Sequence, residues 1–431
     1  MDISGAAKLP NGTSVGTTSG APLNLATTGD QIFAYDTNNV PTSNANQSGF
    51  IAAIGMNGPW DSDATSDRTS ALPSIFNTLA NSHITPGTEH DNAVLDCNAT
   101  NTITKGSPAA LRASIHNEAN WILTNVDAGT PLQPSNCGFE VVYVWKGLTS
   151  DWNTAGNWEG DTAPTLNDDI LITSSPIGGN YPTNSTGVSF NDMTIESGAT
   201  FITTATTNGT ITFNKNIANT NWHLISSPVS GETFTEFNAS HTLATGGSGN
   251  VGFAPYNTTT NTWDYYTNST VANLNDGQGY SLKLAAAGGI SFTGDANSGD
   301  IQYTLSSGTS NFNLLGNPFT AYFNSGLFLT ENTSNLTEET IWVWDGSQYL
   351  TYAKSQFHMI PAGEAFFVEA SSSAMVNFDA DDQSHFSTAL KTATEEFTLS
   401  INNGTSKKST KISFVEDKTC LLYTSPSPRD A

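Results

Sequence analysis

The chain has 431 residues, of which 14 are Lys or Arg and 39 are Asp or Glu, so its formal net charge is −25. Binding to nucleic acid or to an anionic membrane surface requires clustered basic side chains, so this balance argues against both partners. Only 12% of the residues are charged and 10% are aromatic, which indicates several folded domains with a sizeable core rather than a charged disordered tail.

Residues 1–139 predict a first β-sandwich domain with one short helix. The runs 31–35 and 50–55 are rich in β-forming residues and are bounded by turn residues, as expected for strands. Ser107 can cap a helix and Pro108 suits its first turn, so we expect a short helix directly after them.

A candidate calcium loop lies in the same segment, because Asp61, Asp63 and Asp67 bring carboxylates together around two serines. Calcium prefers oxygen ligands, but this loop lacks the glycine and the terminal glutamate of an EF-hand. Turn capping and solvation are the alternative interpretation. The same two interpretations apply to two other acidic groups: Asp168 with Asp169, and Asp379 with Asp381 and Asp382.

Cys97 and Cys137 lie in the first predicted domain, whereas Cys420 lies near the C-terminus. We expect a disulfide between Cys97 and Cys137, which suits an oxidising compartment. In the chain-entropy model, closing a loop of about 40 residues stabilises the folded state by roughly 3–4 kcal/mol. Two unpaired buried thiols are the alternative. A two-cysteine metal site is disfavoured, because no histidine lies at ligand spacing from either residue.

Residues 140–219 predict a small solenoid-like or sandwich unit with short alternating strands, such as 193–199. Trp145, Trp152 and Trp158 lie at its start and are candidates for a platform on which sugar rings stack. The alternative is that the three indole rings cover a β-core, which is the more frequent role of such tryptophans.

Residues 220–385 contain an internal repeat, in which 221–228 aligns with 311–318 and 277–283 aligns with 363–369 at nearly the same offset. The conserved order of elements indicates two copies of one strand set that differ in loop length. Each copy alone would expose an apolar sheet face. We therefore predict a pseudo-symmetric β-sandwich in which the two copies cover each other.

Residues 386–419 predict the start of a further β domain, with strand-like runs at 396–401 and 410–414. Residues 420–431 resemble the translation of a sequencing adapter, so we treat this tail as non-native; a natural proline-rich tail is the alternative. No signal peptide or sorting domain is visible, and we expect the chain to be truncated at both ends. No run approaches the roughly 18 apolar residues of a transmembrane helix, so membrane insertion is not expected.

The sequence predicts no catalytic site. The run 247–252 matches G-x-G-x-x-G, but Pro255 follows it and would block the helix that a dinucleotide site requires. The histidines show none of the spacings that are typical of zinc sites. They are His83, His90, His116, His223, His241, His358 and His385.

Several motifs resemble those of a known class of exported proteins. The W-x-G, DW and NW segments within 145–158, followed by 168–172, closely resemble the opening of a module in exported proteins of the Bacteroidetes. The elements 314–318 and 361–368 resemble the module that precedes the C-terminal sorting domain of type IX-secreted proteins. The resemblance covers most of 140–418, and it implies a lineage and an export route rather than an activity.

These observations predict tandem β-sandwich modules with a small unit between them, in a non-enzymatic extracellular or outer-membrane-surface protein for adhesion, display or spacing. Its partners would be extracellular polysaccharide or a surface protein, and no cofactor other than calcium is expected. The alternative is a glycan-binding accessory region of a larger secreted hydrolase, which exposed rings among six tryptophans would favour: Trp145, Trp152, Trp158, Trp263, Trp342 and Trp344. A third hypothesis, a hydrolase site within 1–139, requires a concave pocket with two facing carboxylates.

Overall fold

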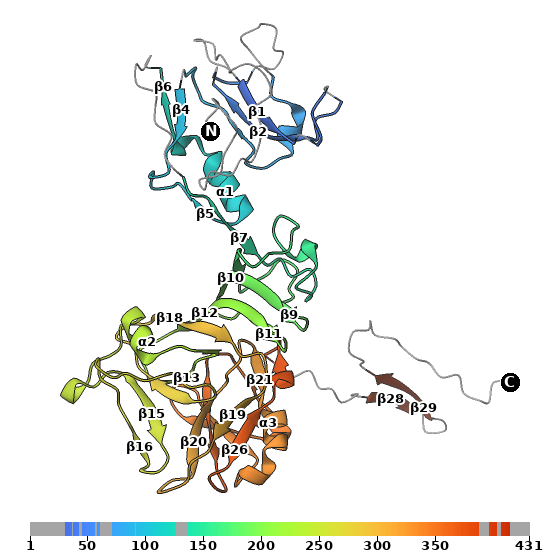
Figure 1. The fold of residues 1–431 in the computed structure, drawn as a ribbon. Coiled ribbons are helices and arrows are strands. Elements are labelled where there is room, and N and C mark those ends of the chain that lie inside the picture. The colour runs from blue at the N-terminus through green and yellow to red at the C-terminus, as the bar shows by residue number, and fades with distance from the viewer. Residues whose placement is uncertain are drawn as a thin grey trace, which may run out of the picture. The chain divides into compact units, whose positions relative to one another are not determined.

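The computed structural model describes residues 31–36, 38–42, 45–56, 58–60, 71–90, 92–125, 137–387, 396–402 and 407–413. Strands make up 40% of the structure and helices 13%, so the predicted all-β fold class is confirmed. The chain divides into two compact units (Figure 1). The first comprises Met1–Thr183, Gly187–Ala199 and Asn208–Thr212, and the second comprises Asn184–Thr186, Thr200–Thr207 and Phe213–Ala431. The finer domain boundaries at 139, 219, 385 and 419 stay predictions.

The first unit contains a three-stranded sheet in the order β1-β2-β3. Its strands are β1 (Gln31–Tyr35), β2 (Phe50–Gly55) and β3 (His83–Ile84). β2 runs antiparallel to β1 and parallel to β3. Phe33 packs against Phe50 with ring centroids 5.3 Å apart, and Phe50 packs against the buried Phe76 at 5.6 Å. Aromatic contacts therefore supply the core of this sheet.

The predicted short helix is present as α1 (Pro108–Ile115). The Ser107 hydroxyl oxygen accepts a hydrogen bond from the backbone N–H of Ala110 at 3.1 Å, as an N-cap residue does. Pro108 occupies the first turn, where its missing N–H has no partner to lose.

The predicted disulfide between Cys97 and Cys137 is also confirmed, with the two Cα atoms 5.6 Å apart. Cys97 follows β4 (Asn92–Leu95), which pairs antiparallel with β6 (Trp121–Thr124). The bond therefore ties the segment after β4 to the segment that leads into the next sheet.

In that next sheet, four parallel strands of the first unit lie in the order β10-β8-β7-β5. They are β5 (Lys105–Gly106), β7 (Glu140–Val144), β8 (Asp169–Ile172) and β10 (Val188–Ile195). Ile170, Ile172, Met193 and Ile195 are buried, as expected where parallel strands are covered. In the chain, β9 (Thr183–Asn184) precedes β10, and β11 (Ile202–Thr203) and β12 (Thr207–Ile217) follow it.

The second unit contains two strand sets with the same topology. The first sheet has the order β13-β17-β15-β16 and the second has the order β20-β25-β22-β23. In each set a short strand and a helix follow the first strand, and a further strand follows the last strand of the sheet in chain order. The first set comprises β13 (His223–Ser226), β14 (Val229–Ser230), α2 (Phe234–Ser240), β15 (Phe253–Asn257), β16 (Thr262–Trp263), β17 (Gly279–Leu282) and β18 (Gly288–Ala296). The second comprises β20 (Phe312–Gly316), β21 (Tyr322–Asn324), α3 (Ser325–Glu331), β22 (Thr340–Trp344), β23 (Tyr349–Ala353), β25 (Ala365–Glu369) and β26 (Met375–Phe378).

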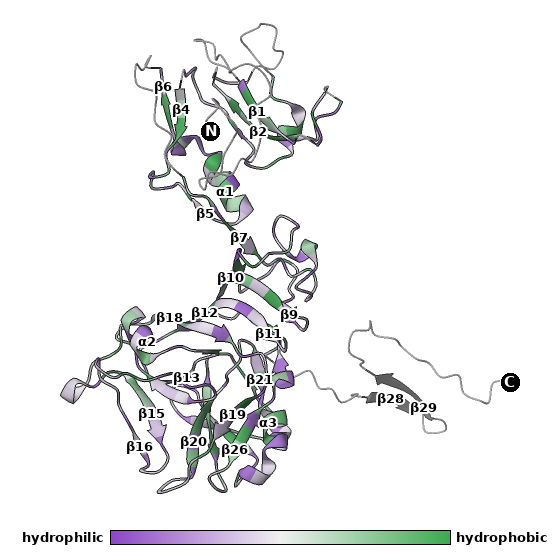
Figure 2. Ribbon diagram, viewed as in Figure 1, coloured by the Kyte–Doolittle hydropathy of each residue, from purple (hydrophilic) through white to green (hydrophobic). Residues whose placement is uncertain are grey.

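Each set has apolar contacts of its own with a helix, in addition to the apolar cluster that the two sets share. In the first set, Phe253 of β15 packs against Phe234 and Phe237 of α2 at 5.0 and 5.4 Å. In the second set, Phe328 of α3 packs against Phe366 of β25 at 5.7 Å. Figure 2 shows hydrophobic residues concentrated on β20 and β26. A helix therefore covers one face of each sheet, and only the other face is left for contacts between the sets.

The two sets meet through reciprocal contacts. The Ser226 backbone N–H donates to Gly363 O at 3.3 Å, and the equivalent Gly316 N–H donates to Gly277 O at 2.9 Å. A Cβ atom on Gly316 would lie 2.1 Å from the Cβ of Ser226, so this close approach requires glycine on one side. Equivalent residues of the two sets thus make equivalent contacts with each other's set. A two-fold axis produces the same reciprocity at the interface of a symmetric dimer.

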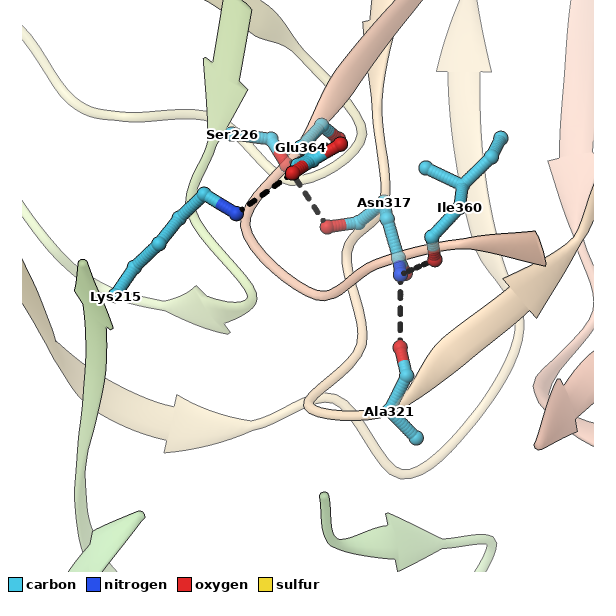
Figure 3. Close-up of polar contacts among 6 residues, drawn as sticks. All are labelled: Lys215, Ser226, Asn317, Ala321, Ile360 and Glu364. Carbon is cyan, nitrogen blue, oxygen red and sulfur yellow. Dashed lines mark hydrogen bonds and ion pairs between the residues drawn. The ribbon is translucent and has the colours of Figure 1, made fainter. Parts of the chain in front are cut away.

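A buried polar network holds this junction (Figure 3). The Asn317 side-chain amide donates to Ala321 O at 2.8 Å and to Ile360 O at 2.9 Å. The Ser226 hydroxyl donates a hydrogen bond to the backbone oxygen of Asn317 at 3.0 Å. Lys215 of β12 forms an ion pair with Glu364 at 3.0 Å. The Leu-Leu-Gly-Asn-Pro element of the repeat therefore has a structural role.

The remaining strands extend the second unit. β19 (Ile301–Thr304) pairs with β26, and both β24 (Met359–Ile360) and β27 (Gln383–Ser384) pair with β21. β28 (Glu396–Asn402) and β29 (Lys407–Ser413) form the antiparallel hairpin expected after residue 386.

Candidate binding surface

The three tryptophans proposed for sugar stacking are buried, with exposed fractions of 1% for Trp145, 3% for Trp152 and 0% for Trp158. Trp158 packs edge-on against Trp145 at 4.9 Å and against Trp152 at 4.8 Å. The indole N–H of Trp145 donates to Asn180 O at 2.7 Å, and that of Trp158 donates to Trp152 O at 2.8 Å. No ring face is open to a sugar, so the stacking interpretation is corrected in favour of a β-core.

The residues around these rings explain the rest of the W-x-G motif. Gly147 has a φ of +69°, and a Cβ there would lie 2.1 Å from Asn180 O. Asn157 is fully buried, and its amide donates to Thr149 Oγ1 and to Asp151 O, both at 2.7 Å. The residues of the motif are therefore used for packing and for internal hydrogen bonds rather than for binding.

The predicted calcium ligands Asp61, Asp63 and Asp67 lie outside the described residues. Asp168 accepts hydrogen bonds from the backbone and hydroxyl of Thr165, and so caps the turn before β8. Burial opposes ionisation of Asp169, but hydrogen bonds from Lys105 and Asn191 outweigh it and lower the pKa of this carboxyl. Both carboxylates thus have structural partners, as the capping interpretation expects.

The acidic group near residue 380 is similar. Asp379 accepts from the Asp381 backbone N–H at 2.8 Å, and Asp300 accepts from the Ala380 N–H at 3.0 Å. Asp382 is 6% exposed, and burial next to Glu331 raises its pKa to about 8. Across the described ranges, no group of three or more His, Cys, Asp or Glu side chains has the geometry to hold a metal ion.

The G-x-G-x-x-G match forms a short 3₁₀ turn, Gly247–Gly249, and leads into a strand rather than a helix. The nearby His241 is part of the core: its Nδ1 lies 2.7 Å from Phe237 O, and its Nε2 accepts from the Ser291 N–H at 2.9 Å. Burial lowers the pKa of His241.

A different set of aromatic side chains lies where the two sheets meet, on the faces that α2 and α3 do not cover, and some of its rings are partly exposed. Alternation along β22 directs Ile341 and Val343 towards the core of the second set, so Trp342 and Trp344 lie on the opposite face. We call this set the aromatic surface. Its members are Tyr256, Trp263, Phe312, Trp342, Trp344, Tyr349 and Phe367.

Strand pairing brings these rings together. Trp344 is directly opposite Tyr349, and Trp342 is opposite Phe367, so each pair shares one face of the sheet. In the first strand set, Tyr256 is opposite Trp263 in the same way. The two cross-strand aromatic pairs occupy equivalent positions of the repeat.

Phe367 lies at the centre of the aromatic surface and is 7% exposed. Its ring centroid is 5.1 Å from Tyr256, 5.7 Å from Tyr349 and 6.2 Å from Trp263. Phe312 packs edge-on against Trp342 at 5.1 Å. The outer rings keep one side open: Tyr349 is 46% exposed and Phe312 is 36% exposed.

Hydrogen bonds fix the outer rings. The Trp344 indole N–H donates to Trp222 O at 2.9 Å, the Tyr256 hydroxyl donates to Asn261 Oδ1, and its oxygen lies 3.2 Å from Ser310 Oγ. Burial, and after it the neighbouring Tyr256, raises the pKa of the Tyr349 phenol above its usual value. The surface is thus a preformed array of uncharged rings.

Of the six tryptophans whose exposure would favour glycan binding, Trp263, Trp342 and Trp344 lie half-buried on this surface. Phe312 and Tyr349 were not predicted from the sequence. The signal for Tyr349 is its place at the start of β23, opposite Trp344 at the end of β22, which puts both rings on one face.

Comparison with protein-family models, with curated proteins and with solved structures finds no match to this chain. Within the described part of the chain, no helix is long and apolar enough to cross a membrane.

Proposed function

We propose that this chain is a non-enzymatic extracellular or cell-surface protein that adheres to its target through the aromatic surface. The observation that carries the proposal is the exposure of Tyr349 (46%) and Phe312 (36%) beside Phe367, at the border of the apolar cluster in which the two strand sets meet. Binding sites are enriched in rigid aromatic side chains because these bury a large area at a low cost in conformational entropy.

A display or spacing role is compatible with this proposal. The two sheets of the second unit have separate cores, and the first unit has its own aromatic core and a disulfide. Modules that fold around their own cores can hold a binding face at a distance from an anchor. The disulfide supports an oxidising compartment, and with it an extracellular location.

The export route and lineage belong to the same proposal. The W-x-G segment and the Leu-Leu-Gly-Asn-Pro element support type IX secretion in the Bacteroidetes, because each is a structural motif of the module it resembles. The alternative function, a glycan-binding accessory region of a larger secreted hydrolase, is favoured by the same aromatic surface, since accessory modules bind through exposed rings.

An adhesion assay tests the proposal. Beads coated with the full chain should be retained on bacterial envelopes and on extracellular polysaccharide, and the double variant Phe312→Ala/Tyr349→Ala should lose most of this retention. Phe386→Ala is the matched control, because Phe386 is a 53% exposed aromatic residue outside the surface. Retention of the wild type no higher than that of an inert protein would contradict the proposal.

A further inference from the structure

We propose that His241 is a pH-sensitive contact of the first strand set: it binds the C-terminal end of α2 to β18 at neutral pH and releases it when acid protonates the ring. This inference goes beyond the proposed adhesive function and does not depend on it. It rests on the hydrogen bonds of the histidine and on an asparagine at the equivalent place in the second strand set.

Both ring nitrogens of His241 have a partner. The residue directly follows α2, and its Nδ1 lies 2.7 Å from the backbone oxygen of Phe237, one helical turn earlier. Its Nε2 lies 2.9 Å from the backbone nitrogen of Ser291 on β18. Because an amide N–H can only donate, Nε2 is the acceptor and Nδ1 carries the proton. Only the neutral imidazole allows this arrangement, since both nitrogens of the protonated ring are donors.

The second strand set fastens its helix in the same way without a titratable group. Asn332 directly follows α3, and its side-chain amide donates to Phe328 O at 2.9 Å, again one turn earlier. Its Oδ1 accepts from the Asn377 N–H of β26 at 2.9 Å. Asn377 and Ser291 are equivalent, because each lies directly before a fully buried phenylalanine of its strand. Of these two equivalent contacts, only that of His241 can respond to pH.

The contact closes an apolar core. The ring of His241 lies 4.3 Å from that of Phe237 between centroids. Phe237 in turn packs against Phe253 of β15 at 5.4 Å and against Phe292 of β18 at 5.3 Å, and all three phenylalanines are fully buried. Release of α2 from β18 therefore opens the core of the first strand set and leaves the cover that α3 provides in the second set in place.

The direction of the pH effect follows from burial. Burial lowers the pKa of His241, and this outweighs the hydrogen bond to the Phe237 carbonyl, which raises it. An imidazole in an opened or unfolded chain has a pKa near 6.5, so the open form binds a proton more readily than the closed form. The stability of the contact is therefore fully present above about pH 6.5 and is lost as the pH falls below it.

Glu232, the other titratable group that contacts this edge of β18, responds to pH in the opposite direction. It precedes α2 and accepts a hydrogen bond from the Thr293 N–H. Burial, with a smaller contribution from Glu236 of α2, raises the pKa of Glu232 to about 7. Its contribution to stability is present below about pH 4.5 and is lost as the pH rises towards 7, so acid strengthens this contact.

The remaining charged side chains of the adjoining elements have other surroundings. Asp295 of β18 is exposed, and the Lys283 ammonium donates to Thr220 O at 2.8 Å. Burial also lowers the pKa of His358 and, to about 4, that of His385. Both histidines lie outside the first strand set. Their protonation affects the wild type and a His241 variant alike, so a comparison of these two proteins isolates His241.

Hydrogen exchange of the full chain tests the inference, with mass spectrometry as the readout and a correction for the intrinsic exchange rate at each pH. Between pH 7 and pH 5, peptides containing α2 and β18 should lose about 10-fold more protection than those containing α3 and β26. His241→Asn, which copies the residue of the second set, should abolish this difference. His223→Asn is the matched control and should keep it, because His223 lies on β13 of the same set and its Nε2 contacts the Asn219 side chain.

NMR titration of the His241 imidazole in the wild type gives a readout that requires no variant to fold, and its midpoint should lie below about pH 6.5. A midpoint at or above this value, or an equal loss of protection in the two strand sets, overturns the inference. A difference that persists in His241→Asn overturns it as well. Glu232→Gln should keep the acid response, and its loss in this variant would assign the response to Glu232 instead.

Discussion

Asp382 is a buried carboxyl whose Oδ2 has no hydrogen-bond partner within the described structure. Burial and the carboxylates of Glu331, Asp379 and Asp381 raise its pKa to about 8. The folded chain thus holds a proton that the unfolded chain releases near pH 4. The stability that this proton supplies is fully present below about pH 4 and is lost as the pH rises towards 8.

Asp382→Asn removes the titrating group while keeping the shape of the side chain. We expect the variant to be more stable than the wild type at pH 8 by about 1–3 kcal/mol, with the difference shrinking towards pH 5. Urea unfolding at several pH values measures this. If the unfolding free energies of the two proteins changed with pH in the same way, Asp382 would be ionised in the folded state, which would contradict this prediction.

Asn317 is the polar residue on which the repeat junction depends most. Its side-chain N–H groups donate hydrogen bonds to Ala321 O and Ile360 O, and its Oδ1 accepts one from the Phe319 N–H at 3.0 Å. Asn317→Ala should cost about 2–4 kcal/mol of unfolding free energy, because these buried groups lose their partners. Asn268→Ala, at an exposed asparagine, should change stability by less than about 0.5 kcal/mol. Equal effects of the two substitutions would contradict the role given to Asn317.

Single residues also show where the sequence is informative. Ser107 and Pro108 predicted α1 correctly because capping is local chemistry. The roles of Trp145, Trp152 and Trp158 stayed open between core and platform, because burial depends on residues such as Asn180 that lie far along the chain.

At the scale of secondary-structure elements, the closest contact between the two strand sets is that of Ser226 with Gly316. Gly316→Ala should destabilise the fold by about 1–3 kcal/mol, since its new methyl group would overlap the Ser226 side chain. Adding Ser226→Gly should recover part of this loss, giving a coupling of about 0.5–3 kcal/mol in a double-mutant cycle.

Gly288→Ala is the matched control, because a Cβ at Gly288 meets nothing within 4 Å. The cycle is measured by urea unfolding of the four proteins. Additivity within about 0.5 kcal/mol would mean that the two positions do not touch in solution.

The two helices of the second unit, α2 and α3, were not predicted from the sequence. α2 begins with a capping box, in which the Thr233 hydroxyl accepts from the Glu236 N–H at 3.2 Å. That Thr-x-x-Glu signal is visible in the sequence. α3 is harder to predict, because Asn324 caps it without the partner glutamate of a capping box. These two helices provide each strand set with its own cover, which the apolar pattern of the strands alone did not reveal.

The aromatic surface was predictable only in part, for a related reason. Alternation along β22 assigns Trp342 and Trp344 to one face, but it does not say whether a helix or another sheet covers that face. The answer depends on α3, which packs on the side of Ile341.

At the scale of the whole chain, the division into two units predicts two unfolding transitions. The disulfide Cys97–Cys137 lies in the first unit. Reduction should lower the stability of one transition by roughly 3–4 kcal/mol and leave the other unchanged. Calorimetry with and without a reducing agent measures this, and Cys97→Ala/Cys137→Ala should be insensitive to the reductant. A shift of both transitions would contradict independent units.

The central claim is that the chain adheres through the aromatic surface, and hydroxyl-radical footprinting tests it most directly. The full chain is oxidised free in solution and again while it is bound to a surface that retains it, and modified residues are identified by mass spectrometry. We predict that Phe312, Trp342 and Tyr349 are modified in the free chain and protected in the bound one, while Trp145, Trp152 and Trp158 stay unmodified in both. Protection at other exposed residues, with Phe312 and Tyr349 modified equally in both states, would contradict the claim.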